Sequence, residues 1–219
     1  MDDLSLYVYN KPNAGIVNLG WYAHAEGEGS QALERAAHAE GRDTKAKGQY
    51  SHTEGRETEA AYCGHAEGRK SKATNEYSHA EGSSTTASGK TSHAEGASTQ
   101  SIGDYSHSEG QETKSKGARS HAEGWKSETK EEATAAHAEG YDTRANGLYS
   151  HSEGRGCRAN GESSHAEGHY TIASSNYQHV QGKYNVEDKD GVYAHIVGNG
   201  YDGNRRNIHT LDWDGNAWF

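Results

Sequence analysis

The chain of 219 residues is only 31% hydrophobic, has one Phe, one Met and one Pro, and carries a formal net charge of −10. Globular domains normally have about 45–50% apolar residues, so this composition excludes an ordinary single core and leaves disorder or stacked repeats that share a narrow core. The acidic balance and the lack of a Lys/Arg cluster argue against nucleic acid as a partner. No stretch approaches the roughly 18 apolar residues of a membrane span, and residues 1–20 show no signal-peptide pattern.

The first predicted element, over residues 1–22, is an N-terminal cap or linker. Stacked repeats need caps that cover their open strand edges, and this segment is richer in apolar residues than the middle of the chain. Its apolar residues are Leu4, Tyr7, Val8, Tyr9, Ile16, Val17, Leu19 and Trp21.

The motif H-A-E-G dominates residues 23–182 and recurs at steps of mostly 14 residues. With His195, which follows residue 182, thirteen of the fifteen His residues of the chain fall in this series, so chance does not explain it. We name its His and Glu residues from His24 to His179 the His–Glu ladder. The ladder consists of His24, Glu26, His38, Glu40, His52, Glu54, His65, Glu67, His79, Glu81, His93, Glu95, His107, Glu109, His121, Glu123, His137, Glu139, His151, Glu153, His165, Glu167 and His179.

The second half of each repeat reads T-x-A-x-G, as in Thr85–Gly89 and Thr143–Gly147. Two glycines per repeat and the absence of a 3.6-residue apolar stripe argue against helix. Glycine instead suits the positive φ of tight corners between short strands. The pattern therefore predicts an all-β fold, a parallel β-solenoid of about 12–13 coils with one 14-residue repeat per coil.

Alternation along a strand decides which side chains face inward. In H-A-E the Ala lies on one face and the His and Glu lie on the other. In T-x-A the long side chains at x, such as Lys45 and Arg144, seek water, which turns Thr and Ala inward. The predicted interior is therefore built from Ala, Thr and Ser, which are small enough for so narrow a coil.

The ladder positions are nearly uniform along the chain, whereas the x positions vary, and this contrast indicates a shared packing partner. Glu carboxylates stacked about 4.8 Å apart repel by roughly 3–4 kcal/mol per neighbour at an effective dielectric constant of about 20. We therefore expect several copies of the chain to pack their ladders together, with His of one chain hydrogen-bonding Glu of the next. One alternative is a solvated polar face in recently duplicated repeats. Another alternative is binding of Zn or Ni by the imidazoles. A repeated structural pair of His and Glu is the simpler explanation, so we predict no metal.

The sequence S-H-A-E-G followed by T-x-A-x-G resembles the YadA-like head repeat of trimeric autotransporter adhesins, which reads S-V-A-I-G and then S-x-A-x-G. The similarity covers about Trp21 to Gly182. It implies a left-handed parallel β-roll that assembles as a homotrimer around a threefold axis. His79 and Glu81 stand at positions where the family has Val and Ile, so the resemblance implies a polar contact at that axis.

The chain has two cysteines. Cys63 and Cys157 lie between six and seven repeats apart, too far for a disulfide, and are predicted to be free thiols.

One repeat is longer than the others around it. The step from His121 to His137 is 16 residues long, and Trp125 near it is a candidate for stacking on a sugar. The alternative for Trp125 is a corner aromatic that packs on its neighbours.

The C-terminal segment, residues 183–219, is predicted to be a cap and the start of a following module, with receptor contact as the alternative. Its last part, Tyr193–Phe219, together with the H-A-E-G repeats, is similar to tail-fibre and appendage proteins of phages and prophages of Gram-positive bacteria. The stretches D-K-D-G at 188–191 and D-W-D-G at 212–215 lack the later ligands of a calcium loop and predict turns.

The sequence has no H-E-x-x-H, no phosphate-binding glycine loop and no nucleophile set apart from the repeat, so we expect a non-enzyme without a cofactor. The functional hypothesis is a homotrimeric structural segment of a phage or prophage tail fibre or appendage, located in the virion or at a cell surface. It would support attachment to a host cell-surface receptor or glycan. The alternative is a trimeric adhesin head whose outer surface binds host matrix or glycan.

Overall fold

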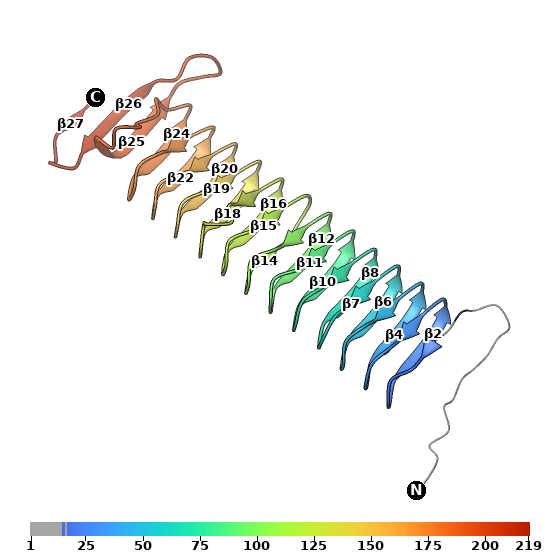
Figure 1. Ribbon diagram of the computed structural model, residues 1–219. Helices are drawn as coiled ribbons and strands as arrows, with labels where there is room; N and C mark the ends of the chain where they lie inside the picture. Colours follow the sequence, from blue (N-terminus) through green and yellow to red (C-terminus); the bar gives the residue numbers. More distant parts are fainter. Residues whose placement is uncertain (1–14, 16) are drawn as a thin grey trace, which may run out of the picture. The chain divides into compact units, whose positions relative to one another are not determined.

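The computed structural model describes Gly15 and residues 17–219. The predicted cap residues Leu4, Tyr7, Val8, Tyr9 and Ile16 lie outside the described residues. The described chain is all-β without helix and forms a parallel β-solenoid of about 13 turns with a spacing of about 14 residues, which confirms the predicted fold class. Figure 1 shows each turn as one strand-bearing coil, in sequence order. No helix long and apolar enough to cross a membrane occurs in this part of the chain.

The chain divides into two compact units, residues 1–98 and residues 99–219, which are described separately. In unit 1 each coil contributes one longer strand that carries the H-A-E-G motif and one two-residue strand. The longer strands are β2 (His24–Glu28), β4 (His38–Arg42), β6 (His52–Arg56), β8 (His65–Arg69), β10 (His79–Ser83) and β12 (His93–Ala97). The short strands are β1 (Val17–Asn18), β3 (Gln31–Ala32), β5 (Lys45–Ala46), β7 (Glu59–Ala60), β9 (Lys72–Ala73) and β11 (Thr86–Ala87).

Unit 2 repeats the same arrangement and then ends in an antiparallel addition. The strands that carry the motif are β14 (His107–Ser108), β16 (His121–Trp125), β18 (His137–Tyr141), β20 (His151–Arg155), β22 (His165–His169) and β24 (His179–Lys183). The short strands are β13 (Gln100–Ser101), β15 (Lys114–Ser115), β17 (Glu128–Thr129), β19 (Arg144–Ala145), β21 (Arg158–Ala159) and β23 (Ile172–Ala173). The final strands are β25 (Tyr193–Asn199), β26 (Asn207–Asp212) and β27 (Ala217–Trp218).

Equivalent residues of successive coils pair in register. His79 pairs with His93 and Glu81 with Glu95 in unit 1, and His121 pairs with His137 in unit 2. Between the two rows of strands the interior is filled as predicted, because Ala, Thr and Ser side chains at the inward positions are almost completely buried. Ala80 and Thr85, for example, have no exposed surface.

The glycine of H-A-E-G is required by the close approach of successive coils. Gly82 has a φ of +107°, and a Cβ atom on it would lie 2.2 Å from the carbonyl oxygen of Gly96. The glycine of T-x-A-x-G has the same steric role without a left-handed backbone: a Cβ on Gly147 would lie 2.0 Å from the carbonyl oxygen of Gly161. The expectation that glycine supplies the positive φ of every corner is therefore only partly right.

The left-handed corner positions are occupied mostly by residues other than glycine. Two positions of nearly every coil have a positive φ: the residue two before the ladder His, such as Tyr149 at 56°, and the residue five after it, such as Asp142 at 51°. Such a backbone costs an L-residue roughly 1–2 kcal/mol. Hydrogen bonds close the corner: the Oγ atom of Ser150 donates to the carbonyl of Gly147 at 2.7 Å.

A buried polar network joins the last complete coil to the C-terminal segment. The buried Gln178 side chain accepts from the backbone N–H of Ser174 through Oε1 and donates through Nε2 to Asp188 and to the carbonyl of Tyr193. β25 continues the parallel stack beside β24, and β26 then pairs antiparallel to β25. In this way the open edge of β24 is covered within unit 2.

The two cysteines are free, as predicted. Cys157 is buried in unit 2 among Ala159, Ala166 and Val180, and Cys63 is partly buried at a corner of unit 1.

Candidate interaction surface

The outer side of each longer strand presents the His–Glu ladder. His121, His137 and His151 each keep about a third of their side-chain surface exposed, and so do Glu123 and Glu139. Both side chains leave the strand on the face opposite the buried Ala, as alternation predicts. The ladder therefore remains accessible to solvent or to a partner along each unit.

The ladder imidazoles stack on one another within each unit. In unit 1 the ring centroids of His52 and His65 lie 4.7 Å apart, and so do those of His65 and His79. The two ring planes of each pair are within 6° of parallel. In unit 2 the rings of His121 and His137 lie 4.8 Å apart at 5°. This spacing is the strand spacing, so one rotamer is repeated from coil to coil.

Imidazoles of the ladder lie close to carboxylates at distances too long for a hydrogen bond, as His137 illustrates. The Nε2 atom of His137 lies 3.8 Å from an oxygen of Glu123 in the preceding coil and 3.7 Å from one of Glu139 in its own coil. Several of these Nε2 atoms are buried and have no hydrogen-bond partner. They belong to His52, His65, His79, His121, His137, His151, His165 and His179. The ladder is thus a close array of His and Glu in which the Nε2 atoms of these eight His residues are not satisfied by its carboxylates.

The pKa values of several ladder side chains are shifted, upward for one Glu and downward for His residues. A hydrogen bond with Glu109, together with burial and the charge of Glu139, raises the pKa of Glu123 to about 7. Burial, reinforced by neighbouring imidazoles, lowers the pKa of His121 and His151. Stacking of like groups therefore favours the neutral form of these two imidazoles and of the Glu123 carboxyl.

Trp125 lies in strand β16 and not in the inserted corner. Its ring meets Tyr141 edge-on at a centroid distance of 4.5 Å, and the Lys126 Nζ atom lies 4.7 Å from its ring centroid. The two extra residues of this coil are Glu131 and Glu132, both exposed. Trp125 is half-buried, so its surroundings match the corner-packing alternative more closely than an open stacking platform.

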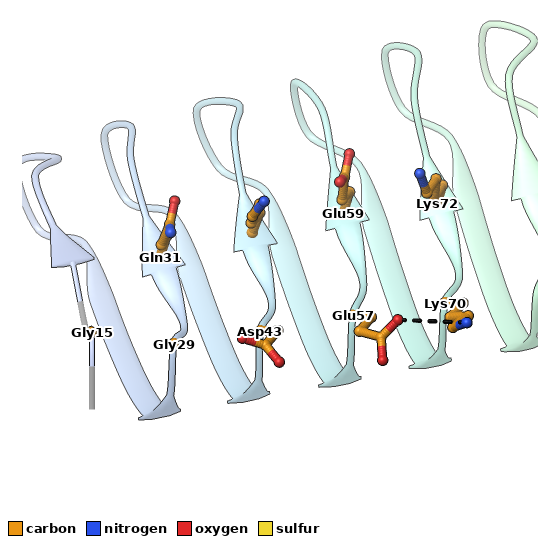
Figure 2. A pocket seen from close by; sticks show the side chains of 9 residues that line it. Gly15, Gly29, Gln31, Asp43, Glu57, Glu59, Lys70 and Lys72 are labelled. Carbon is orange, nitrogen blue, oxygen red and sulfur yellow. Dashed lines mark ion pairs between the residues drawn. The ribbon is translucent and has the colours of Figure 1, made fainter. Parts of the chain in front are cut away.

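A groove on unit 1 was not foreseen from the sequence. It has a volume of about 710 Å³ and is lined by residues of five successive coils. It lies between the short-strand row and the left-handed corner row, which Figure 2 shows as two parallel lines of labelled residues. Glu57 and Lys70 form an ion pair across successive coils at 3.7 Å. The residues that line the groove are Gly15, Gly29, Gln31, Asp43, Lys45, Glu57, Glu59, Lys70 and Lys72. In the sequence, the groove is indicated only by the charged side chains at the x positions of T-x-A, such as Lys45 and Lys72.

A second cavity, of about 450 Å³, lies at the C-terminal end of unit 2. Tyr170 and Tyr184 stack at 5.1 Å, and the guanidinium of Arg205 lies over the Tyr184 ring. Arg205 also donates to the carbonyls of Tyr170 and Asn185. The Tyr184 ring is therefore contacted by both Tyr170 and Arg205 of the protein itself.

The two aspartate-rich stretches of the C-terminal segment form turns. Asp188 accepts from the backbone N–H groups of Val192 and Tyr193. Asp212 accepts from the N–H groups of Asp214 and Asn216, and the hydrogen bonds from Asn216 lower its pKa. These contacts are those of turns, as the sequence predicts.

No model of a known protein family matches the sequence, and no curated protein matches it. Function is therefore inferred from the solenoid and from the surfaces that it presents.

Proposed function

We propose that the chain is a structural segment of a phage or prophage tail fibre or appendage, in which three copies pack their His–Glu ladders together and support attachment to a host cell. The ladder carries this proposal. On this surface the same two side chains recur in nearly every coil, and the Nε2 atoms of eight of its His residues, named above, have no hydrogen-bond partner in their own chain. Buried polar groups without partners are costly, so a second chain that pairs with them would stabilise the assembly.

The coil architecture fits a structural role. Most coils bury mainly Ala, Thr and Ser, and they gain further stabilisation from backbone hydrogen bonds to the next coil. Repeats of this kind contact mainly their neighbours, so such a stack is assembled from many equivalent small contacts. The assignment to phage or prophage and to a virion rests on the resemblance of the repeats and of Tyr193–Phe219.

The test is the solution mass by light scattering at neutral pH. The proposal expects about three times the chain mass of 23.7 kDa. A monomer at concentrations well above the micromolar range would overturn it, because the ladders would then face solvent.

An adhesin head is the second candidate, and the groove of unit 1 favours it. Lys45, Lys72 and Glu57 present charged groups in a cavity large enough for a short segment of matrix protein or glycan. Binding of the isolated protein to immobilised matrix proteins or glycans, lost on Lys45→Glu and Lys72→Glu, would support this role. Saturable binding that survives both changes would place the contact elsewhere.

A further inference from the structure

The buried Nε2 atoms of the ladder point to a ligand that supplies positive charge. In unit 2 these atoms belong to His121, His137, His151, His165 and His179, and none has a hydrogen-bond partner among the described residues. A hydrogen-bonded His–Glu pair, the simplest reading of the sequence, is not formed at these nitrogens. The contacts are 3.5–3.9 Å long.

Each carboxylate in this region lies between two imidazole nitrogens. Oxygens of Glu123 are 3.9 Å from the Nε2 atom of His121 and 3.8 Å from that of His137. One ligand atom from each of these three residues lies within 4.8 Å of the others. The same is true of His137, Glu139 and His151, and again of His151, Glu153 and His165.

Two imidazole nitrogens and a carboxylate oxygen form a ligand set for zinc, nickel or cobalt, whereas calcium and magnesium prefer oxygen alone. Ligand atoms around a tetrahedral zinc ion lie about 3.4 Å apart, given bond lengths of about 2.1 Å. The carboxylate and imidazole atoms must therefore approach by about half an ångström, and one of the two stacked rings must turn toward the ion. Rotation of side chains that keep about a third of their surface exposed supplies both movements.

We propose that the His–Glu ladder binds divalent transition-metal ions of the zinc class, each held by one Glu and the two His residues on either side of it. The site lies within one chain and does not depend on the number of copies in the assembly. Neighbouring groups share a His, and one Nε2 atom binds one ion. The three groups of unit 2 named above therefore hold about two ions at a time, in alternate positions.

The experiment uses the untagged full chain, freed of metal with a chelator and dialysed against zinc at neutral pH. Zinc bound per chain is measured by elemental analysis, and cobalt replaces zinc to report coordination through its visible absorption. We expect saturable zinc binding that millimolar magnesium or calcium does not displace. Less than one zinc per chain, or displacement by magnesium, overturns the proposal.

A double variant locates the site. His137→Gln with His151→Gln breaks the three groups named above and is expected to lose about two zinc ions per chain. The matched control, His169→Gln with His209→Gln, removes the two histidines outside the series and is expected to keep the wild-type count. Equal loss in both variants would place the metal elsewhere.

A second variant covers the case in which the His double variant does not fold, which circular dichroism reports. Glu123→Gln, Glu139→Gln and Glu153→Gln together keep the shape of the ladder, remove its negative charge and are expected to lose the same ions. Retained zinc in the folded triple variant contradicts the proposal. Light scattering of the metal-free protein tests the trimer separately, so either hypothesis can fail while the other stands.

Discussion

The Gln178 side chain donates to the Asp188 carboxylate at 3.0 Å, and both groups are buried beneath the C-terminal strands. Asp188 also accepts from the N–H of Tyr193 at 2.8 Å. Asp188→Ala would leave a buried amide and two backbone N–H groups short of partners. We expect it to lower the free energy of unfolding by about 1–3 kcal/mol, measured by denaturant titration.

Asp190→Ala is the control for this change. Asp190 lies two residues away in the same segment and is exposed. We expect an effect within about 0.5 kcal/mol, as for ordinary surface positions. Similar losses for Asp188→Ala and Asp190→Ala would show that the buried network does not hold the cap in place.

The proposed ladder contact between copies predicts a selective effect on thermal stability. Replacing His52, His65 and His79 together by Gln removes three stacked imidazoles from unit 1. We expect a sharply lower melting temperature of the assembly, together with a lower mass in light scattering at micromolar concentrations.

Replacing Lys45, Lys72 and Lys114 by Gln is the matched control for the ladder change. These residues stand at the outward position of the short strands. Lys72 is exposed and Lys45 and Lys114 are partly exposed, and charges of this kind contribute little to stability, so we expect a melting temperature close to that of the wild type. Equal shifts in the two triple variants would count against the ladder as an interface.

The glycine of the H-A-E-G motif is expected to tolerate no side chain. Gly82→Ala places a Cβ atom 2.2 Å from the carbonyl oxygen of Gly96 on a backbone with a φ of +107°. We expect a loss of about 3 kcal/mol or more, because the next coil must move away. Gly203→Ala has a positive φ but no atom within 4 Å, and is expected to lose only about 1–2 kcal/mol. Unfolding titrations of both variants measure the difference, and equal losses would mean that strain alone, and not coil spacing, excludes the side chain.

The ion pair of Lys47 and Glu59 predicts a small acid-dependent loss of stability. The Lys47 Nζ atom donates to Glu59 at 2.7 Å and lowers the pKa of that carboxyl below its ordinary value of 4.5. A carboxyl with a lowered folded-state pKa stabilises the fold above its unfolded pKa, and the contribution is lost as the pH falls through the folded value. Both groups are partly exposed, so we expect only about 0.2–1 kcal/mol.

Unfolding titrations at pH 7 and pH 3 measure this contribution. Lys47→Gln should reduce the loss of stability on acidification, whereas Lys183→Gln, an exposed lysine of unit 2, should leave the loss unchanged. If both variants behave like the wild type, the pair contributes nothing measurable.

The repeat period and the choice of inward residues could be predicted because they follow from chain geometry alone. Ala80 and Thr85 face inward since strand alternation leaves no other place for them. The corner conformation could not be predicted in the same way. Tyr149 adopts a positive φ that an L-residue normally avoids, and only its place in the coil imposes it.

The ladder was predictable as a surface but not in its contacts. The period places His137 beside Glu123 and Glu139, yet it does not show whether Nε2 reaches a carboxylate oxygen or stops at 3.7–3.8 Å. That difference depends on the side-chain rotamers that stacking imposes. Trp125 is a similar case, because its contact with Tyr141 depends on the residue that happens to follow the next H-A-E-G motif.

The approach of Gly82 to Gly96 recurs at the same place in successive coils of each unit, which makes the coils interchangeable. Deleting or duplicating one whole 14-residue repeat within a unit would bring equivalent surfaces together again. Every contact between successive coils would then be restored. Deleting any other number of residues from the strands would bring a side chain against a carbonyl where a glycine is needed. The longer coil at Glu131 and Glu132 meets this condition because its extra residues project from a corner. Natural variants of this sequence are therefore expected to differ in length by complete repeats or at corners.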